Sequence, residues 1–331
     1  MRAVILHSEL CESAGPDEQD TLVQVASVKE ALQTLGDEVF PLPFSEDAYL
    51  AREQLLNKQP DYVFNLTESV NGRGSLAFLA PALLSELNIP YTGCGATALH
   101  LTTDKVAAKR ILRRFGIPTP PSLSLADTSA DCKLLPGGKY IMKCAAEDAS
   151  IGLEDSCVVT VNNGGELRSL LEKRNARTGT AHFAEQFIAG REFNIAVLEL
   201  SDGFHVLPAA EIIFDSFPPD KERIVGYKAK WESDTFEYAN TPRSYAAFRS
   251  EPGLCGTLAD LSRACCTLFE LHDYVRVDFR IDEHGRPWVL EMNPSPCIAP
   301  DSGFIAAASE AGMTYVQVIE RIVARAKERV C

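Results

Sequence analysis

The sequence predicts an α/β (α+β) protein built from three consecutive units. In about the first hundred residues, apolar strand-like runs alternate with helical runs, which is typical of a parallel sheet with helical crossovers. The next part of the chain is richer in strands, and the last third holds two adjacent strands before a helical tail. We therefore place the domains at residues 1–100, 101–188 and 189–331.

The first unit holds three strands separated by helices. Each strand is a short apolar run, and Gly36 is a typical stop for the first helix. A further helix lies between the second and third strands. The predicted strands are 2–7, 38–44 and 61–66, and the predicted helices include 21–36 and 75–87.

The second unit opens with a helix that Thr102 or Thr103 caps and that Gly116 and the prolines after it end. Its predicted strands are 139–145, 156–161 and 182–188, with a helix at 165–175. The third unit is predicted to contain strands 192–200, 204–214, 274–282 and 286–293, a polar segment 215–252, a helix 253–271 and a helical tail from about 301.

The composition argues against several classes of protein. The chain of 331 residues has a net charge of −14, which repels nucleic-acid backbones, so we expect no nucleic acid as a partner. No apolar run is long enough to span a membrane, and the first apolar run is too short for a secretory signal. None of the ten cysteines forms a C-x-x-C pair, so we expect reduced thiols. These features predict a cytoplasmic protein.

The two strands 274–282 and 286–293 hold a candidate metal site. Strand side chains alternate between faces, so Arg276, Asp278 and Arg280 share one face. Glu291 and Asn293 likewise share one face of the returning strand. A hairpin could therefore gather Asp278, Glu291 and Asn293 as oxygen ligands for Mg²⁺ or Mn²⁺. The alternative is the ordinary alternation of polar side chains on a surface strand.

Lys143 and the loop after it form a candidate phosphate site. A lysine within an apolar strand needs a partner for its charge. The small-residue loop 149–152 could bring backbone N–H groups to phosphate oxygens, although a plain hairpin loop is the alternative. Neither G-x-x-x-x-G-K-[ST] nor a G-x-G-x-x-G after the first strand is present, which argues against a P-loop enzyme and a dinucleotide dehydrogenase.

Two more segments suit a nucleotide. Glu185 lies in an apolar strand and Glu192 follows a glycine turn, so this edge could face an adenine and a ribose; a solvated hinge is the alternative. The polar segment 225–234 contains Lys230 and Trp231 and would suit a flap over bound phosphate. A charged surface loop would have the same composition.

Taken in order, these segments resemble the ATP-grasp ligases and are most similar to the D-alanine–D-alanine ligases. The similarity is carried by "LLSELNIPYTGCGATALHLTTDKVAAKRILRRFGIPTPP" and continues through "MKCAAEDASIG", "EQFIAGREF", "GYKAKW", "VRVDF", "EMNPSP" and "DS". It covers most of the chain from about residue 60 onward. The resemblance implies an ATP-grasp fold, with a Rossmann-like N-terminal domain and ATP held between two antiparallel sheets.

The resemblance also implies roles for individual residues. By motif match, the residues that would contact ATP are Lys105, Lys143, Glu185, Ile188, Glu192 and Lys230. The metal ligands would be Asp278, Glu291 and Asn293. The catalytic residues would be Arg276, which stabilises an oxyanion, Ser150 and Lys230. The residues around the amino-acid substrates would be Glu68, Cys297, Asp301 and Ser302.

The implied activity is an ATP-dependent ligase reaction that joins two amino acids through an acyl phosphate and releases ADP and phosphate. ATP and Mg²⁺ are the implied cofactors, a homodimer is the implied assembly, and peptidoglycan biosynthesis is the implied setting. Three alternatives stay open. They are a ligase for other amino or hydroxy acids, a nucleotide-binding homologue without ligase activity, and a phosphotransferase that uses the same ATP site.

Departures from the family pattern gather on the amino-acid side. Cys297 stands where the family has a glycine, and no histidine is paired with it as a nucleophilic cysteine would require. Trp231 stands where the family has a tyrosine, and its indole offers no phenolic hydroxyl. The N-terminal signature is absent, so the candidates for binding the first substrate's ammonium are Glu12, Glu18 and Glu68. The resemblance therefore supports ligase chemistry more than it supports D-alanine as the substrate.

Overall fold

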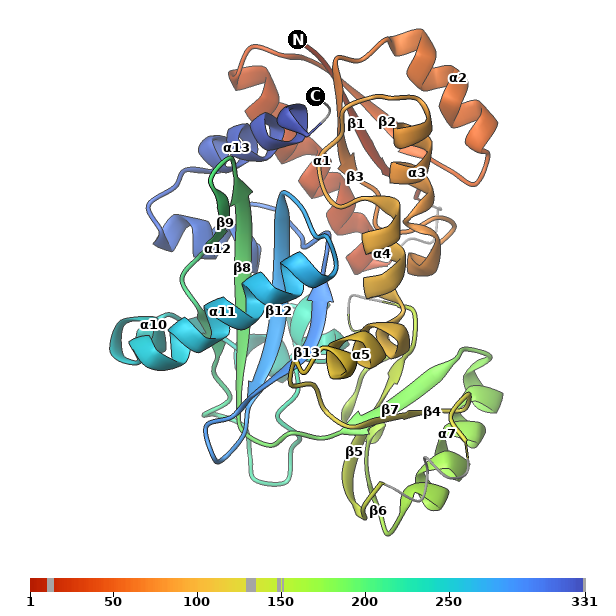
Figure 1. Cartoon of the computed structure of the whole chain (residues 1–331), viewed down its shortest axis with the longest axis vertical. Helices are drawn as coiled ribbons and strands as arrows, with labels where there is room; N and C mark the ends of the chain where they lie inside the picture. Colours follow the sequence, from red (N-terminus) through yellow and green to blue (C-terminus); the bar gives the residue numbers. More distant parts are fainter. Residues whose placement is uncertain (11–14, 129–134, 148–149, 151, 330–331) are drawn as a thin grey trace.

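The computed structural model describes residues 1–10, 15–128, 135–147, 150 and 152–329, and it contains three separate sheets (Figure 1). The strands of the first sheet fall between residues 2 and 66, those of the second between 122 and 186, and those of the third between 191 and 293. The mixed α/β class is therefore confirmed. The domain boundaries at 100 and 188 stay a prediction, although each sheet lies within one of the predicted ranges.

The N-terminal sheet is parallel, with strand order β2-β1-β3. Its strands are β1 (Arg2–Ser8), β2 (Glu38–Phe44) and β3 (Tyr62–Leu66), and the helices around it are α1 (Pro16–Thr34), α2 (Ala48–Lys58) and α3 (Leu79–Glu86). The buried positions of α1 are 21, 24, 25, 28, 31 and 32, which is the spacing of one helical face. Helix α1 begins earlier than predicted because Pro16 suits the first helical position and the Glu18 carboxylate accepts from the Gly15 N–H at 3.1 Å.

The predicted helix cap at Thr102 or Thr103 is wrong. Both threonines are buried in the last turn of α4 (Ala96–Thr103), and the Thr102 hydroxyl donates to the Ala98 carbonyl. The cap of the next helix, α5 (Lys105–Arg114), is Asp104, whose carboxylate accepts from the backbone N–H groups of Val106 and Ala107. A carboxylate at a helix N-terminus satisfies N–H groups that lack a partner within the helix. Asp104 therefore favours the end of α4 and the start of α5 at this position.

The central sheet is antiparallel, with strand order β4-β7-β5-β6. Its strands are β4 (Ser122–Ser124), β5 (Gly138–Cys144), β6 (Val158–Val161) and β7 (His182–Gln186). Helix α7 (Gly164–Thr178) covers one face, where Leu167 and Leu171 pack against Tyr140 and Met142. The opposite face is left for the cleft described below.

The C-terminal sheet has the strand order β11-β10-β8-β12-β13, with β9 paired to β8. Its strands are β8 (Arg191–Leu200), β9 (Gly203–Val206), β10 (Ala210–Ile212), β11 (Arg243–Ser244), β12 (Tyr274–Ile281) and β13 (Pro287–Asn293). The predicted strand 204–214 is thus two strands, because residues 207–209 leave the ladder. The polar segment is not a plain loop, since it contains β11 and the short helices α8 (Tyr227–Trp231), α9 (Phe236–Ala239) and α10 (Ala246–Ser250).

Three helices cover the C-terminal sheet. Helix α11 (Pro252–Leu268) packs on one face, while α12 (Gly303–Glu310) and α13 (Tyr315–Glu328) lie on the other (Figure 1). Helix α13 also packs against α1, so one apolar core joins Val28 and Tyr62 of the first unit to Leu198, Ile319 and Ile322 of the third. The first and third units therefore share a core, and this fixes their relative position.

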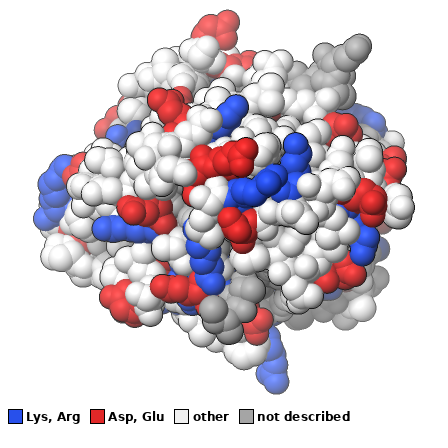
Figure 2. Space-filling model, turned by 90° about the horizontal axis from the view of Figure 1, so that it is seen from above, with Lys and Arg blue, Asp and Glu red and all other residues white. Residues whose placement is uncertain are grey.

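The surface mixes both signs of charge. Figure 2 shows acidic side chains lying beside basic ones over the face seen from above. Among the described residues, no helix combines the length and apolar character that crossing a bilayer requires.

Candidate active site

A cleft of about 1750 Å³ opens between the central sheet, the C-terminal sheet and the carboxyl ends of β1 and β3. Ligands of parallel sheets commonly bind outside these carboxyl ends. All the predicted site residues line this cleft, namely Glu68, Lys105, Lys143, Ser150, Glu185, Ile188, Glu192, Lys230, Arg276, Asp278, Glu291, Asn293, Cys297, Asp301 and Ser302. Of the other residues singled out above, Glu12, Ala149 and Ile151 lie outside the described part of the chain.

The hairpin of β12 and β13 carries the predicted metal ligands. In its register Asp278 lies opposite Glu291, and Arg276 lies opposite Asn293, so these side chains share one face and point into the cleft. Sequence reasoning missed how Asp278 is held: Arg276 donates two hydrogen bonds to its carboxylate, at 2.7 and 2.8 Å. The Asn194 amide donates a third at 2.8 Å. Asp278 and Arg276 are therefore a pair in this structure.

Four cations surround Glu291. The Lys105 ammonium lies 3.5 Å from its carboxylate, and Lys143, Lys230 and Arg276 are close enough to act on its charge. Burial alone would raise the pKa of the Glu291 carboxyl, but these four cations hold the pKa well below its usual range. We call Lys105, Lys143, Lys230 and Arg276 the cation cluster.

The cation cluster is crowded. Burial and the nearby Arg276 guanidinium together lower the pKa of Lys230, although Glu291 and Asp278 act in the opposite direction. A set of like charges in a partly desolvated cleft is stabilised by an added anion. The arrangement therefore suits a polyanionic ligand such as a triphosphate.

Glu185 joins two lysines at the base of the cleft. Its carboxylate lies 2.6 Å from the Lys143 ammonium and 2.5 Å from that of Lys109. The register of β5 and β7 places Ile141 opposite Glu185, so Lys143 lies diagonally across on the same face. Burial would raise the pKa of Glu185, but the two lysines lower it overall, and the carboxylate stays ionised.

Sequence reasoning missed Lys109. Its side chain is about 2% exposed, and its ammonium also donates to the Thr119 hydroxyl and the Leu290 carbonyl, both at 3.0 Å. A signal existed, because the buried positions of α5 are 105, 108, 109 and 112, and Lys109 therefore lies on the apolar face of the helix. A lysine on such a face requires a buried partner.

The predicted adenine and ribose edge follows β7. Ile188 is buried, and the Glu192 carboxylate pairs with Arg280 at 2.7 Å. Arg280 also donates to the carbonyl oxygens of Gly190 and Arg223, so three partners, from the start of β8 and from the polar segment, determine its position. The Glu192 carboxylate is thereby held in one orientation at the cleft wall.

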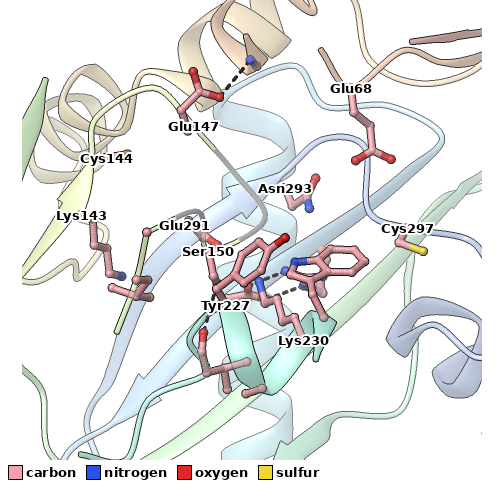
Figure 3. Close-up of a pocket in the computed structure, with 18 of the residues that line it drawn as sticks. Glu68, Lys143, Cys144, Glu147, Ser150, Tyr227, Lys230, Glu291, Asn293 and Cys297 are labelled. Carbon is pink, nitrogen blue, oxygen red and sulfur yellow. Dashed lines mark hydrogen bonds and ion pairs between the residues drawn. The ribbon is translucent and has the colours of Figure 1, made fainter. Parts of the chain in front are cut away.

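The predicted flap is the short helix α8 with the residues before it. The Ser150 hydroxyl donates to the Val225 carbonyl at 3.1 Å, and the Tyr227 N–H donates to the Leu153 carbonyl at 3.1 Å. These bonds dock the flap on the central unit. Figure 3 shows Tyr227 and Lys230 projecting into the cleft near Ser150 and Glu291.

On the amino-acid side, the predicted residues have local structural partners. Ser302 caps α12 by accepting from the Ile305 N–H, and the Asp301 carbonyl accepts from Arg243. Cys297 donates to the Asp20 carboxylate at 3.0 Å. Asp20 was not a predicted site residue, because no local pattern connects a polar helix start with a loop near residue 297.

Two antiparallel sheets that enclose a cleft with a cation cluster, an acidic hairpin and a flap define an ATP-grasp protein. A family model described as "D-ala D-ala ligase C-terminus" matches residues 128–324, more than half of the chain. The chain belongs to the D-alanine–D-alanine ligase family, of which it is a divergent member. The family predicted from the sequence is therefore confirmed.

Three relatives each match at least 90% of this chain at moderate identity. D-alanine–D-alanine ligase of Gloeobacter violaceus is 30% identical over 328 residues, which is 96% of this chain and 97% of that protein. The ligase of Pseudomonas putida is 32% identical over 307 residues, or 90% and 86%. The uncharacterized protein y4sG of Sinorhizobium fredii is 29% identical over 310 residues, or 92% and 87%.

Solved structures confirm the ATP-grasp fold over the full length. A D-alanine–D-alanine ligase of Bacillus anthracis, complexed with ATP, has a TM-score of 0.71 and 20% identity, and the match covers 100% of this chain and 98% of that one. The enzyme of Coxiella burnetii has a TM-score of 0.70 and 16% identity, covering 100% and 96%.

Proposed function

We propose that this protein is an ATP-dependent carboxylate–amine ligase that joins two amino acids and releases ADP and phosphate. The observation that carries the proposal is the cation cluster around Glu291, in a cleft between two antiparallel sheets. A binding site for a neutral ligand would not require three lysines and an arginine around one carboxylate. The family membership reported above supports the same reaction class.

The nucleotide would lie across the central sheet. Lys105, Lys143 and Lys230 would bind its phosphates, and Lys143 is about 16% exposed on its cleft side, within reach of a ligand. The base would pack near the buried Ile188, with Glu185 at its edge and Glu192 at the ribose. Charge-assisted hydrogen bonds to phosphate are among the strongest that side chains make.

The hairpin residues fit a divalent cation. Asp278, Glu291 and Asn293 offer two carboxylates and an amide from adjacent positions of β12 and β13, which is the oxygen donor set that Mg²⁺ or Mn²⁺ favours. Among the described residues, no group of three or more His, Cys, Asp or Glu side chains forms a metal site. The proposed set has only two such side chains, Asp278 and Glu291, because its third donor is the amide of Asn293. Magnesium bound here with ATP would supply charge neutralisation at the transferring phosphoryl group.

The chain's own residues would then act on the two amino acids. Transfer of the γ-phosphoryl group to the carboxylate of the first amino acid forms an acyl phosphate and ADP. The amine of the second amino acid attacks the acyl carbon, and Arg276 with backbone N–H groups near Cys297 stabilises the oxyanion. Loss of inorganic phosphate and of the amine proton leaves an amide. The flap that carries Lys230 keeps water from the acyl phosphate.

The setting of the reaction is part of the proposal. Two of the three named relatives are D-alanine–D-alanine ligases, so D-alanine is the reference substrate, and cell-wall synthesis follows if both positions accept it. The departures at Cys297 and Trp231 favour a second candidate, a ligase for other amino or hydroxy acids. We further propose that the protein is cytoplasmic, acts on small molecules and forms a homodimer. Sedimentation of the purified chain would test the homodimer.

The deciding experiment is ADP and phosphate release from Mg²⁺ and ATP across a panel of D- and L-amino acids and hydroxy acids. Mass spectrometry of the products distinguishes an amide from a phosphorylated acid, which a phosphotransferase would give. Amide with equal amounts of ADP and phosphate supports the proposal. ADP formation with none of the acids would contradict it.

A further inference from the structure

The central unit has an apolar core of its own. Among the described residues, the buried members of this core all fall between Leu123 and Ala184, on the central sheet and α7. A second small cluster joins the sheet to the polar segment through Ile224. The first and third units, by contrast, share one core. A unit with a separate core can move relative to its neighbours, so its position depends on the contacts that it makes with them.

Glu147, which follows β5, contacts the first unit. Its carboxylate accepts from the Gly74 N–H at 3.0 Å (Figure 3). Gly74 begins the short helical turn η1 (Gly74–Leu76), and an N–H at the start of a helical turn has no partner within that turn. A backbone N–H that donates to a carboxylate makes a charge-assisted hydrogen bond, which is stronger than one between neutral groups. The side chain of Glu147 therefore joins the central unit to the first unit.

The close approach of Glu147 gives residue 74 a reason to be glycine. A Cβ at Gly74 would lie 3.0 Å from the Glu147 carboxylate oxygen and 3.7 Å from the Ala146 carbonyl oxygen. Gly74 does not have the positive φ that favours glycine at other positions of the chain. The missing side chain therefore makes room for Glu147 and is not needed for an unusual backbone conformation.

The main chain around Glu147 contacts the phosphate side. The Glu147 carbonyl oxygen accepts from the Lys105 ammonium at 2.9 Å, and the same ammonium lies 3.5 Å from the Glu291 carboxylate. The Lys105 N–H donates to the Ala145 carbonyl at 3.0 Å, so the start of α5 is bonded to the same stretch of the central unit. Glu147 therefore connects Gly74 of the first unit with a lysine of the cation cluster.

We propose that Glu147 is a positioning residue, whose side chain holds the first and central units together and thereby places Lys105 for phosphoryl transfer. Glu68, on the predicted amino-acid side, belongs to the first unit, whereas Lys143 belongs to the central unit. A reacting carboxylate and a γ-phosphoryl group must meet in a fixed geometry, and a shift of about 1 Å costs on the order of a hundredfold in rate. This inference rests on the proposed ligase function and adds a residue to it.

The first test compares the steady-state kinetics of the wild type, Glu147→Ala and Glu147→Gln, with Mg²⁺, ATP and the best acids of the panel. Glu147→Ala should lower kcat by about tenfold to a hundredfold, the value of one charge-assisted hydrogen bond. The Kd of a non-hydrolysable ATP analogue should change little, because Lys143 and Lys230 stay in place. Glu147→Gln keeps an acceptor oxygen and should restore most of kcat.

The control for these variants is Glu172→Ala, which removes an exposed carboxylate from α7 of the same unit and should change neither kcat nor Kd. Wild-type kcat in Glu147→Ala would overturn the inference. Equal losses in Glu147→Ala and Glu147→Gln would also overturn it, because the charge and not the hydrogen bond to Gly74 would then be required. Both results would leave the ligase function standing.

Gly74→Ala tests the same contact from the first unit, and it gives a second measurement if Glu147→Ala does not fold. Its Cβ should displace the Glu147 carboxylate and lower kcat. The double variant Gly74→Ala/Glu147→Ala should lose no more than Glu147→Ala alone, because no carboxylate is left to displace. Losses that add in the double variant would overturn the inference.

Small-angle X-ray scattering with the ATP analogue measures the arrangement of the units without turnover. Glu147→Ala should have a larger radius of gyration than the wild type, and equal radii would overturn the inference. Failure of every acid to release ADP from the wild type would instead overturn the ligase function, and the scattering would still decide whether Glu147 holds the units together.

Discussion

The Lys143 ammonium lies 2.6 Å from the Glu185 carboxylate, and the same carboxylate also pairs with Lys109 at 2.5 Å. The two lysines differ in their surroundings. Lys143 is about 16% exposed toward the cleft, whereas Lys109 is about 2% exposed and donates to two further protein oxygens. One lysine can therefore turn to a ligand, while the other holds α5, β7 and β13 together.

This difference predicts opposite outcomes for two substitutions. Lys143→Met should weaken ATP binding at least tenfold and leave most of the stability intact, because Lys109 still pairs with Glu185. Lys109→Met should lower the free energy of unfolding by about 3 kcal/mol, because it leaves one oxygen of the buried Glu185 carboxylate, the Thr119 hydroxyl and the Leu290 carbonyl without their donor. Calorimetry with a non-hydrolysable ATP analogue and urea unfolding measure the two effects. A Lys143→Met protein that binds the analogue normally would remove Lys143 from the phosphate site.

Glu291 should be required for turnover and not for folding. Glu291→Gln keeps the size of the side chain but removes the anion at the centre of the cation cluster, so we expect ADP release to fall by about a hundredfold or more. Circular dichroism should show an unchanged fold. Chelation with EDTA should abolish activity in the wild type, and added Mg²⁺ should restore it. Unaltered rates in Glu291→Gln would contradict the metal assignment.

The docking of the flap predicts a variant that hydrolyses ATP without forming an equal amount of amide. A Cβ at Gly226 would lie 2.6 Å from the Leu153 carbonyl oxygen, so Gly226→Ala should push α8 away from the central unit. Water would then reach the acyl phosphate, and ADP release should exceed amide formation. The matched control is Gly253→Ala in α11, where an added Cβ meets nothing within 4 Å. Equal ADP and amide in Gly226→Ala would show that the flap does not exclude water.

Glu199 makes stability depend on pH. Burial by itself would raise the pKa of its carboxyl, but hydrogen bonds from His272, the Asp273 N–H and Arg325 lower it from 4.5 to about 2. A lowered pKa in the folded state stabilises the fold above pH 4.5, and this contribution is lost as the pH falls from 4.5 toward 2. Its full size is on the order of 3 kcal/mol.

The check for Glu199 compares the wild type with Glu199→Gln in urea at several pH values. The wild type should be the more stable at neutral pH, and the difference in unfolding free energy should narrow below pH 4.5. A difference that is constant with pH would mean that the charge of Glu199 contributes nothing to stability.

Local sequence patterns predicted much of the fold and of the nucleotide side. The period of two in the strands placed Glu291 and Asn293 on one face of their strand, and the register of β12 and β13 brings Asp278 opposite Glu291. The errors are also local in origin. Asp104, not a threonine, caps α5. The first turn of α1 is polar and has no apolar period, so the sequence did not show that the helix begins at Pro16.

By itself, the sequence determined the fold class, the family and the residues available to the nucleotide, because each follows from short-range periodicity or from contiguous motifs. Only the tertiary structure decided which distant side chains meet. The pairing of Lys109 with Glu185, the packing of α13 on α1 and the contact of Asp20 with Cys297 all join residues far apart in the chain. Such contacts depend on how helices and sheets pack in space, and no local period records that packing.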